Sequence, residues 1–161
     1  MRIRTVVADD WRIARRVRLD ALAGSPPGTF STGHAEAVQW DERQWREWTV
    51  RRDPFFVAED DSGPVGSAGV IVSTDGVPEL VSMWTAPVAR GTGTSDRLVQ
   101  AVMLWAAAGY PELRLWVVDG NWVAERLYLR NGFVRTGATR PCAEDDPRPE
   151  HEMAVALPRA G

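Results

Sequence analysis

The sequence predicts one α/β (α+β) domain in which a mixed, twisted β-sheet is flanked by helices. Three observations lead to this prediction. The length of 161 residues suits a single domain, taken as residues 1–161. Strand-like segments alternate with segments of helical apolar spacing in the order β-α-α-β-β-β-α-β-α-β-β. Helices interleaved in this way imply a mixed sheet that is covered on its faces.

The N-terminal part predicts one strand followed by two helices. Alternation predicts the strand over 3–7, and Asp9 or Asp10 offers an N-cap to a helix whose apolar residues recur every four positions. A loop rich in glycine and proline follows, from 24 to about 38, which is long for a compact domain. Asp41 with Gln44 then resembles a capping box for a helix to about 51.

The middle of the chain predicts a run of three strands. Residues 55–59 and 65–72 have strand character and are joined through a polar hairpin turn at 60–64. Asp75-Gly76 makes the next turn, into a strand over 77–85. These strands precede a glycine-rich turn, which opens a helix that ends near Gly109.

The last third predicts a central strand, a helix and a final pair of strands. The apolar run 113–118 predicts the central strand, and Asn121 offers an N-cap to a helix that Asn131-Gly132 ends with a left-handed C-cap. The last strands are expected over 133–138 and 152–157. The polar, proline-rich segment 143–149 between them is expected to be a loop outside the core.

The composition excludes several classes of function. The net charge is −3 and the arginines are scattered, which argues against a nucleic-acid partner. Apolar runs stop well short of the roughly 20 residues that span a membrane, and the N-terminus lacks a secretory pattern, so we expect a cytoplasmic protein with no membrane partner. Cys142 is the only cysteine and the two histidines lie far apart, so we expect no disulfide and no metal site. The chain has no lysine, which rules out a P-loop.

Two segments carry the chemistry. The first is the glycine-rich turn ARGTGTSDRL at 89–98, between a strand and a helix. It presents unpaired backbone N–H groups at the positive end of a helix dipole with no side chains in the way, which predicts a cradle for a phosphate or pyrophosphate. The second is NWVAERLYLRNGF at 121–133. A dinucleotide-binding turn fits poorly, because no third glycine follows at the right spacing.

Together, in this order and setting, the two segments resemble the GCN5-related N-acetyltransferase (GNAT) family, and the resemblance covers nearly the whole chain. The family's coenzyme A signature is Arg or Gln, two residues, Gly, any residue, and Gly or Ala. Arg90 and Gly93 match it, whereas Ser95 stands where glycine or alanine is usual and Thr92 where the family is often basic. The second signature is matched by Asn121, Ala124, Leu127, Tyr128, Gly132 and Phe133.

The resemblance implies a single GNAT-type domain with a binding site for acetyl-CoA. The strand 77–85 is expected to splay from its neighbour and to meet the acetyl and pantetheine amides through backbone groups around Met83, Trp84 and Thr85. Asn121 would bind the pantetheine arm while it caps its helix, and Tyr128 would protonate the departing thiolate. The pyrophosphate is expected on the turn formed by Arg90, Gly91, Thr92, Gly93, Thr94 and Ser95.

The acceptor side has weaker candidates. Glu79, on the strand that runs past the acetyl group, is the first candidate for the base, acting directly or through water. Phe30 and His34 lie in the loop that the resemblance places over the acceptor, and Asp145 in the last hairpin would add negative charge at the entrance. Each assignment has a structural alternative: a core tyrosine, a simple N-cap, a solvated strand-edge glutamate, a solvated loop.

The tryptophans are expected to be mostly structural. Trp84 and Trp116 fall in strands and are expected in the core. Trp45 and Trp48 share a helix face that packs on the sheet, although these and Trp40 could instead line an acceptor pocket.

The predicted reaction is acetyl transfer from acetyl-CoA to a primary amine of a small molecule, by direct attack in a ternary complex, as in modification of an antibiotic or a metabolite. Nothing suggests an activating partner for Cys142, so no covalent acyl-enzyme is expected. The acidic loop and the net charge favour a cationic amine. Two alternatives stay open: a protein N-terminus or lysine as acceptor, and a non-catalytic acyl-CoA-binding sensor that would not need Tyr128. The family's tendency to dimerise admits a homodimer.

Overall fold

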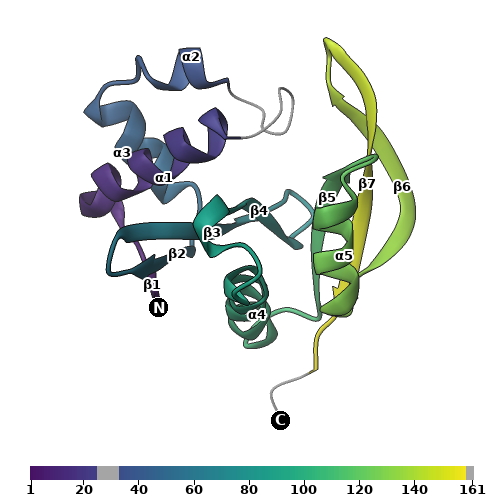
Figure 1. Ribbon diagram of the computed structural model, residues 1–161. Helices are drawn as coiled ribbons and strands as arrows, with labels where there is room; N and C mark the ends of the chain where they lie inside the picture. The colour runs from purple at the N-terminus through teal and green to yellow at the C-terminus, as the bar shows by residue number, and fades with distance from the viewer. Residues whose placement is uncertain (25–32, 159–161) are drawn as a thin grey trace.

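A seven-stranded mixed sheet organises the part of the chain that the computed structural model describes, residues 1–24 and 33–158. The strand order is β1-β2-β3-β4-β5-β7-β6, and β4 and β5 are parallel whereas the other neighbours are antiparallel (Figure 1). The strands are β1 (Arg2–Thr5), β2 (Phe55–Asp60), β3 (Gly63–Val72), β4 (Pro78–Thr85), β5 (Glu112–Val118), β6 (Val134–Ala143) and β7 (Asp146–Ala156).

Helices lie between the strands in the predicted order. They are α1 (Trp11–Ala23), α2 (His34–Ala37), α3 (Glu42–Val50), α4 (Thr94–Ala107) and α5 (Trp122–Arg130), with 3-10 turns η1 (Ala8–Asp10) and η2 (Pro87–Ala89). The fold class is therefore confirmed, with α2 as a single extra turn inside the predicted loop. Within the described ranges, no helix is long and apolar enough to cross a membrane.

The helix boundaries follow from local capping chemistry. Asp41 Oδ1 accepts from the Gln44 N–H at 2.9 Å and Gln44 Oε1 accepts from the Asp41 N–H at 3.0 Å, so the predicted capping box is confirmed. Asn121 Oδ1 accepts from the Ala124 N–H at 3.3 Å, as expected of an N-cap. The predicted cap of α1 is wrong in its bonding. Asp10 precedes that helix, but its carboxylate turns back to the Val7 N–H at 3.0 Å, and η1 forms where the first strand was expected to end.

Two hydrophobic cores cover the two faces of the sheet. Side chains that alternate along β2 separate to opposite faces, with Phe55 and Val57 on one and Ala58 on the other. One core joins the sheet to α4 and α5, and the other joins it to α1 and α3, where Trp45 and Trp48 are buried. The buried positions of these tryptophans and of Trp84 confirm them as core residues.

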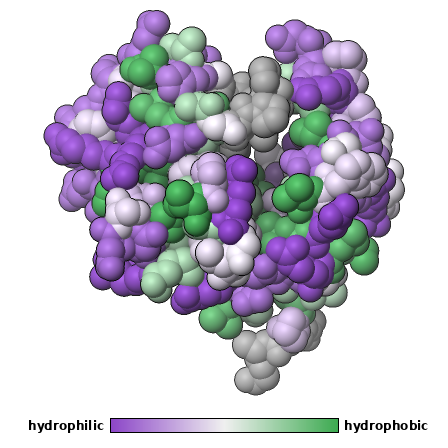
Figure 2. Space-filling model, in the orientation of Figure 1, coloured by the Kyte–Doolittle hydropathy of each residue, from purple (hydrophilic) through white to green (hydrophobic). Residues whose placement is uncertain are grey.

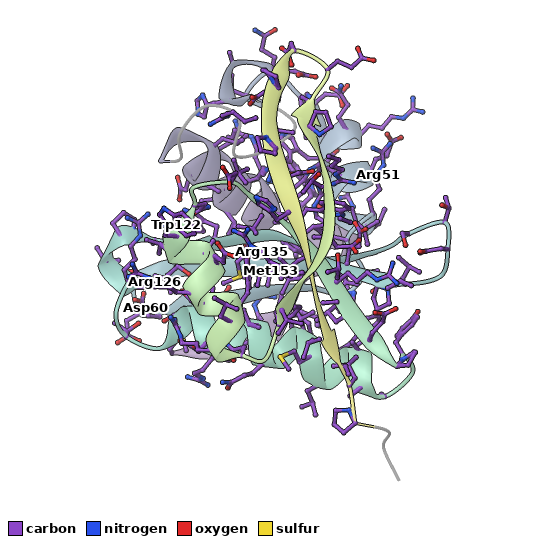
Figure 3. The ribbon with its side chains drawn as sticks, turned by 90° about the vertical axis from the view of Figure 1, so that its right-hand side faces the viewer. Arg51, Asp60, Trp122, Arg126, Arg135 and Met153 are labelled. Carbon is purple, nitrogen blue, oxygen red and sulfur yellow. The ribbon has the colours of Figure 1, made fainter. Side chains whose placement is uncertain are left out.

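The hairpin of β6 and β7 extends much further than the sequence predicted. Pro141 pairs with Pro149 and Ala143 with Asp146, so most of the segment expected to be a loop is paired strand. Figure 3 shows this hairpin rising from the body of the molecule, with Arg135 and Met153 at its base. Because β6 is exposed almost throughout, its outer part has no buried face and therefore no apolar alternation by which to recognise a strand.

Candidate active site

The site opens where β4 and β5 separate. Their registered pairing is the single pair Glu79↔Arg114, although β4 continues to Thr85 and β5 to Val118. The carboxyl-terminal parts of the two strands therefore border a cleft of about 1000 Å³ instead of bonding to each other. Figure 2 shows the surface hollowed between the part that carries α1 to α3 and the hairpin of β6 and β7. The splayed strand predicted from the sequence is thus present.

A bulge on β4 shapes the floor of this cleft. The register between β3 and β4 shifts between Ser67 and Gly69, and Ser82 adopts a left-handed conformation with φ of 54°. The bulge is held from two sides, because Ser67 Oγ donates to the Ser82 carbonyl at 2.8 Å and Arg52 Nε donates to Ser82 Oγ at 2.7 Å. A non-glycine residue in this region is strained and needs such support.

The glycine-rich turn forms the second wall. Gly91 and Gly93 have φ values of +77° and +85°, and nothing lies within 4 Å of the position that a Cβ would take at either residue. The turn leads into α4, whose first-turn amides have no helical acceptor. Thr85 and Ser95 form a side-chain hydrogen bond of 2.8 Å that ties the start of α4 to the end of β4.

The residues of the turn differ in how they face the cleft. Arg90, Gly91 and Ser95 line it. Thr92 and Thr94 bond to each other through their hydroxyls at 2.8 Å, and Thr94 is buried against Met1. The Thr92 N–H is already bonded to the Ala89 carbonyl at 3.4 Å, so a contribution of this pair to a ligand would come from the backbone amide of Thr94.

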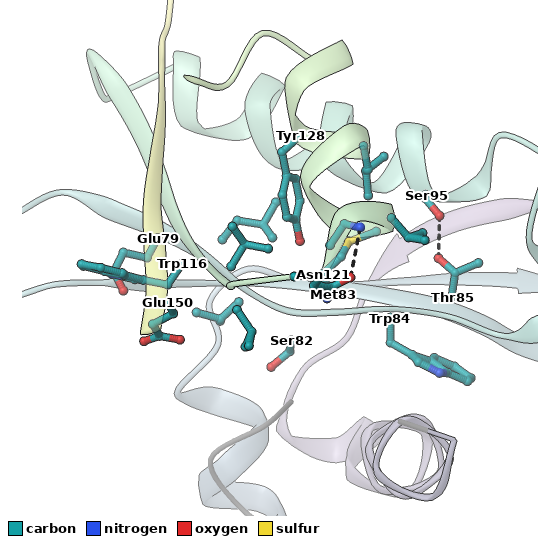
Figure 4. A pocket seen from close by; sticks show the side chains of 18 of the residues that line it. Glu79, Ser82, Met83, Trp84, Thr85, Ser95, Trp116, Asn121, Tyr128 and Glu150 are labelled. Carbon is teal, nitrogen blue, oxygen red and sulfur yellow. Dashed lines mark hydrogen bonds between the residues drawn. The ribbon is translucent and has the colours of Figure 1, made fainter. Parts of the chain in front are cut away.

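Helix α5 supplies the third wall, with Asn121 and Tyr128 in the lining. Tyr128 is 6% exposed and its ring packs on Phe133 at 5.8 Å between centroids. Within the described residues its hydroxyl forms no hydrogen bond, and Figure 4 shows it directed into the cleft above Met83. Burial raises the pKa of Tyr128 above its ordinary value.

An ion pair fixes α5 against the start of α4. Arg130 donates to both oxygens of Asp96, at 2.8 and 2.9 Å, and Asn131 Nδ2 donates to Asp96 Oδ1 at 2.9 Å. These bonds hold the pKa of Asp96 below its ordinary value, with the Arg130 hydrogen bond as the largest cause. The two walls that carry Tyr128 and the glycine-rich turn are thereby held at one separation.

The far end of the cleft gathers Glu79, Trp116 and Glu150 (Figure 4). The prediction that Trp116 belongs to the core is wrong. It is half-buried on the cleft side of β5, and the Arg140 guanidinium lies 4.0 Å from the centre of its ring. The strand pattern could not reveal this, because the apolar ring is covered by a cation from the extended hairpin. Glu150 in turn pairs with Arg140.

Of the three predicted acceptor contacts, the structure describes two, and it brings neither of these to the cleft. Phe30 lies outside the described residues. His34 begins α2 as an exposed side chain and Asp145 is exposed at the tip of the hairpin, and neither lines the cleft. In the described residues, no group of three or more His, Cys, Asp or Glu side chains is arranged to hold a metal ion.

Sequence reasoning missed Arg18 and Arg52, which both line the cleft beside the bulge. Their guanidinium carbons lie 5.3 and 3.8 Å from the centre of the Trp48 ring. One sequence feature could have indicated Arg18. It occupies the stripe of α1 formed with Ala14, Val17 and Ala21, and an arginine on a core-facing stripe is uncommon.

The comparison with protein families decides the affiliation. The profile described as the acetyltransferase (GNAT) domain matches residues 51–135, which is more than half of the chain and includes β4, the glycine-rich turn and Tyr128.

The chain belongs to the GNAT acetyltransferase family.

Solved structures share the fold of this GNAT N-acetyltransferase. A GNAT-family acetyltransferase from Streptococcus pneumoniae superposes with a TM-score of 0.78 at 16% identity, covering 98% of this chain and 99% of that one. Ribosomal-protein-alanine N-acetyltransferase from Brucella melitensis gives 0.78 at 20% identity, covering 98% and 100%. The protein yncA from Salmonella typhimurium, solved with its cofactor acetyl-CoA, gives 0.77 at 19% identity, covering 100% and 96%. A comparison with curated protein sequences finds no match.

Proposed function

We propose that this chain transfers the acetyl group of acetyl-CoA to a primary amine of a small molecule, by direct attack in a ternary complex. The observation that carries the proposal is Tyr128, whose side chain is 6% exposed and whose hydroxyl faces the cleft between the splayed strands without a hydrogen-bond partner in the described residues. A buried polar group is normally satisfied, so this hydroxyl suits a group of the bound substrate.

The donor wall fits acetyl-CoA. The left-handed glycines at 91 and 93 leave open space at the amino end of α4, where unpaired amides and the helix dipole favour a pyrophosphate. The bulged, unpaired part of β4 around Met83 leaves backbone groups facing the cleft, which suits the amides of the pantetheine arm. When bound there, acetyl-CoA supplies an activated thioester.

Tyr128 is the proposed proton donor. Because burial raises its pKa, the phenol stays protonated at neutral pH and its proton is available. A thiolate that forms beside this buried side chain would also lose solvent, which destabilises its charge, so proton transfer from the phenol would relieve the charge of the leaving group.

Glu79 is the proposed base. It lines the cleft at the point where β4 and β5 part, and within the described residues its carboxylate forms no ion pair or hydrogen bond. A free carboxylate there can attract an ammonium group and receive its proton, directly or through water. Cys142 supports direct attack, since its thiol lies on β6 outside the cleft lining and burial raises its pKa.

The test uses the purified protein with acetyl-CoA and an amine panel that includes small amines, peptides with free N-termini and lysine peptides. Calorimetry measures acetyl-CoA binding, and a thiol reagent measures coenzyme A release. Binding with release that depends on a small amine is the expected result. Coenzyme A release with peptides alone would indicate that the acceptor is a protein, and acetyl-CoA binding without coenzyme A release would favour the non-catalytic sensor. Absence of binding would refute the proposal.

A further inference from the structure

The cleft carries more positive charge than the acidic chain as a whole would suggest. Among the described residues its lining holds six arginines and three carboxylates. The arginines are Arg18, Arg52, Arg90, Arg130, Arg140 and Arg148, and the carboxylates are Glu79, Asp119 and Glu150. Most of this lining therefore favours an anionic group, whereas the net charge of the whole chain favoured a cationic amine.

Three of the six arginines form ion pairs with carboxylates, and a fourth stands on the glycine-rich turn. Arg130 is bonded to Asp96, Arg140 to Glu150, and Arg148 to Asp146 at 2.6 Å. Arg90 stands on the glycine-rich turn, where the phosphates of the donor are proposed to bind. Arg18 and Arg52 lie away from that turn, against Trp48 and the bulge.

Arg52 is held firmly by neutral groups. Its Nη1 donates to the Trp48 carbonyl at 3.1 Å, its Nε donates to Ser82 Oγ at 2.7 Å, and its guanidinium carbon lies 3.8 Å from the centre of the Trp48 ring. In residues 1–24 and 33–158, no carboxylate forms an ion pair with it. Its orientation is thus fixed in advance while its charge stays uncompensated, which is what a binding site for an anion requires.

Arg18 brings a second cation to the same place. It is 4% exposed, and its guanidinium approaches the same indole. Burial, followed by the positive charges of Arg18 and Arg51, lowers the pKa of Arg52 to about 9. The positive charge of Arg18 therefore acts on Arg52, and an anion bound at Arg52 would offset it.

We propose that the acceptor carries an anionic group, a carboxylate or a phosphate, in addition to its amine, and that Arg52 and Arg18 bind this group. The inference rests on the proposed function. Ser82, to which Arg52 is bonded, stands three residues after Glu79 on β4, a separation of at most about 10 Å along a strand. Glu79 would receive the amine and the arginines the anion, so the acceptor is a short zwitterion such as an amino acid or an amino phosphate.

The first test uses the unaltered protein and matched acceptors. β-Alanine, β-alaninamide and 2-aminoethylphosphonate offer the same amine with a carboxylate, a neutral amide and a phosphonate. We expect kcat/KM for at least one anionic member to exceed that of the amide by tenfold or more, and the preferred member distinguishes carboxylate from phosphate chemistry. Equal values for all three, or a preference for the amide, would overturn the inference.

The second test examines the arginine directly. In Arg52→Gln the ratio of kcat/KM between anionic and amide acceptors should fall to about one, and Arg52→Lys should restore part of it. Arg51→Gln is the matched control, because Arg51 is an exposed neighbour outside the cleft lining. A ratio that survives in Arg52→Gln would overturn the assignment.

A binding measurement separates this inference from the proposed function. Calorimetry with β-alanine and 2-aminoethylphosphonate on the protein and on Arg52→Gln requires no acetyl transfer. Anion binding that is lost in the variant supports the site even if no amine is acetylated. Identical heats in both proteins would overturn it even if acetylation is observed.

Discussion

Replacement of Tyr128 by phenylalanine separates the chemical role of the phenol from its packing role. The ring is 6% exposed and contacts Phe133, and phenylalanine keeps these contacts. The lost hydroxyl has no hydrogen-bond partner among the described residues, so we expect the free energy of unfolding to change by less than about 1 kcal/mol. General acid catalysis contributes roughly a hundredfold or more, so kcat should fall at least about 100-fold, or about 2.7 kcal/mol.

The assay is acceptor-dependent thiol release under saturating acetyl-CoA, with calorimetry of acetyl-CoA binding beside it. Tyr110→Phe is the control, because the chain has two tyrosines and Tyr110 packs on Trp105 outside the cleft lining. Since burial raises the pKa of Tyr128 above about 10, the unaltered enzyme should lose no activity from its ionisation below that pH. A kcat in Tyr128→Phe within threefold of the unaltered value, with normal acetyl-CoA affinity, would refute the role.

Three further perturbations test the neighbouring features. Gly93→Val places a branched side chain at φ of +85° beside the proposed pyrophosphate and should weaken acetyl-CoA binding at least tenfold by calorimetry. The control is Gly76→Val, at φ of +80° in a turn outside the cleft, which should leave acetyl-CoA binding unchanged. Equal losses of affinity in the two variants would contradict the proposed pyrophosphate cradle. Glu79→Gln should lower kcat/KM at least tenfold at pH 7, and an unchanged value would remove Glu79 as the base. Glu125 forms an ion pair with Arg135 at 2.5 Å, and this pair lowers the pKa of Glu125. The Tm of Glu125→Gln should therefore be lower than that of the unaltered protein at pH 7, and the difference in Tm should shrink as the pH falls below about 4.3. A difference in Tm that does not depend on pH would contradict a stabilising ion pair.

The features that sequence predicted well depend on neighbours along the chain. The capping box of Asp41 and Gln44, the N-cap of Asn121 and the left-handed Gly132 involve residues only a few positions apart. The periodic apolar positions of α4 and the hydrophobic strand β5 gave the order of the elements because each buries a face against the same sheet. The glycine-rich turn was recognisable because a strand, two glycines and a helix follow one another directly.

The features that were missed depend on residues far apart in sequence. Arg52 contacts Ser82 across thirty positions, and Arg140 covers Trp116 from another strand. The length of the β6–β7 hairpin was hidden because a strand solvated on both faces can be polar throughout. Composition also gave no sign of where the charges lie: the net charge is acidic, whereas arginines gather at the cleft and many carboxylates pair elsewhere.

The parting of β4 and β5 has a consequence for how such an enzyme can be altered. On the proposed donor side the contacts would come largely from main-chain amides, the bulge and a helix end, which different side chains can all provide. On the proposed acceptor side they would come from side chains of β7, α1 and the segment that follows α3, such as Glu150, Arg18 and Arg52. Substitutions of these acceptor-side residues can therefore change which amine is bound without changing the groups that hold the thioester. The range of acceptors is thus the property most open to redesign.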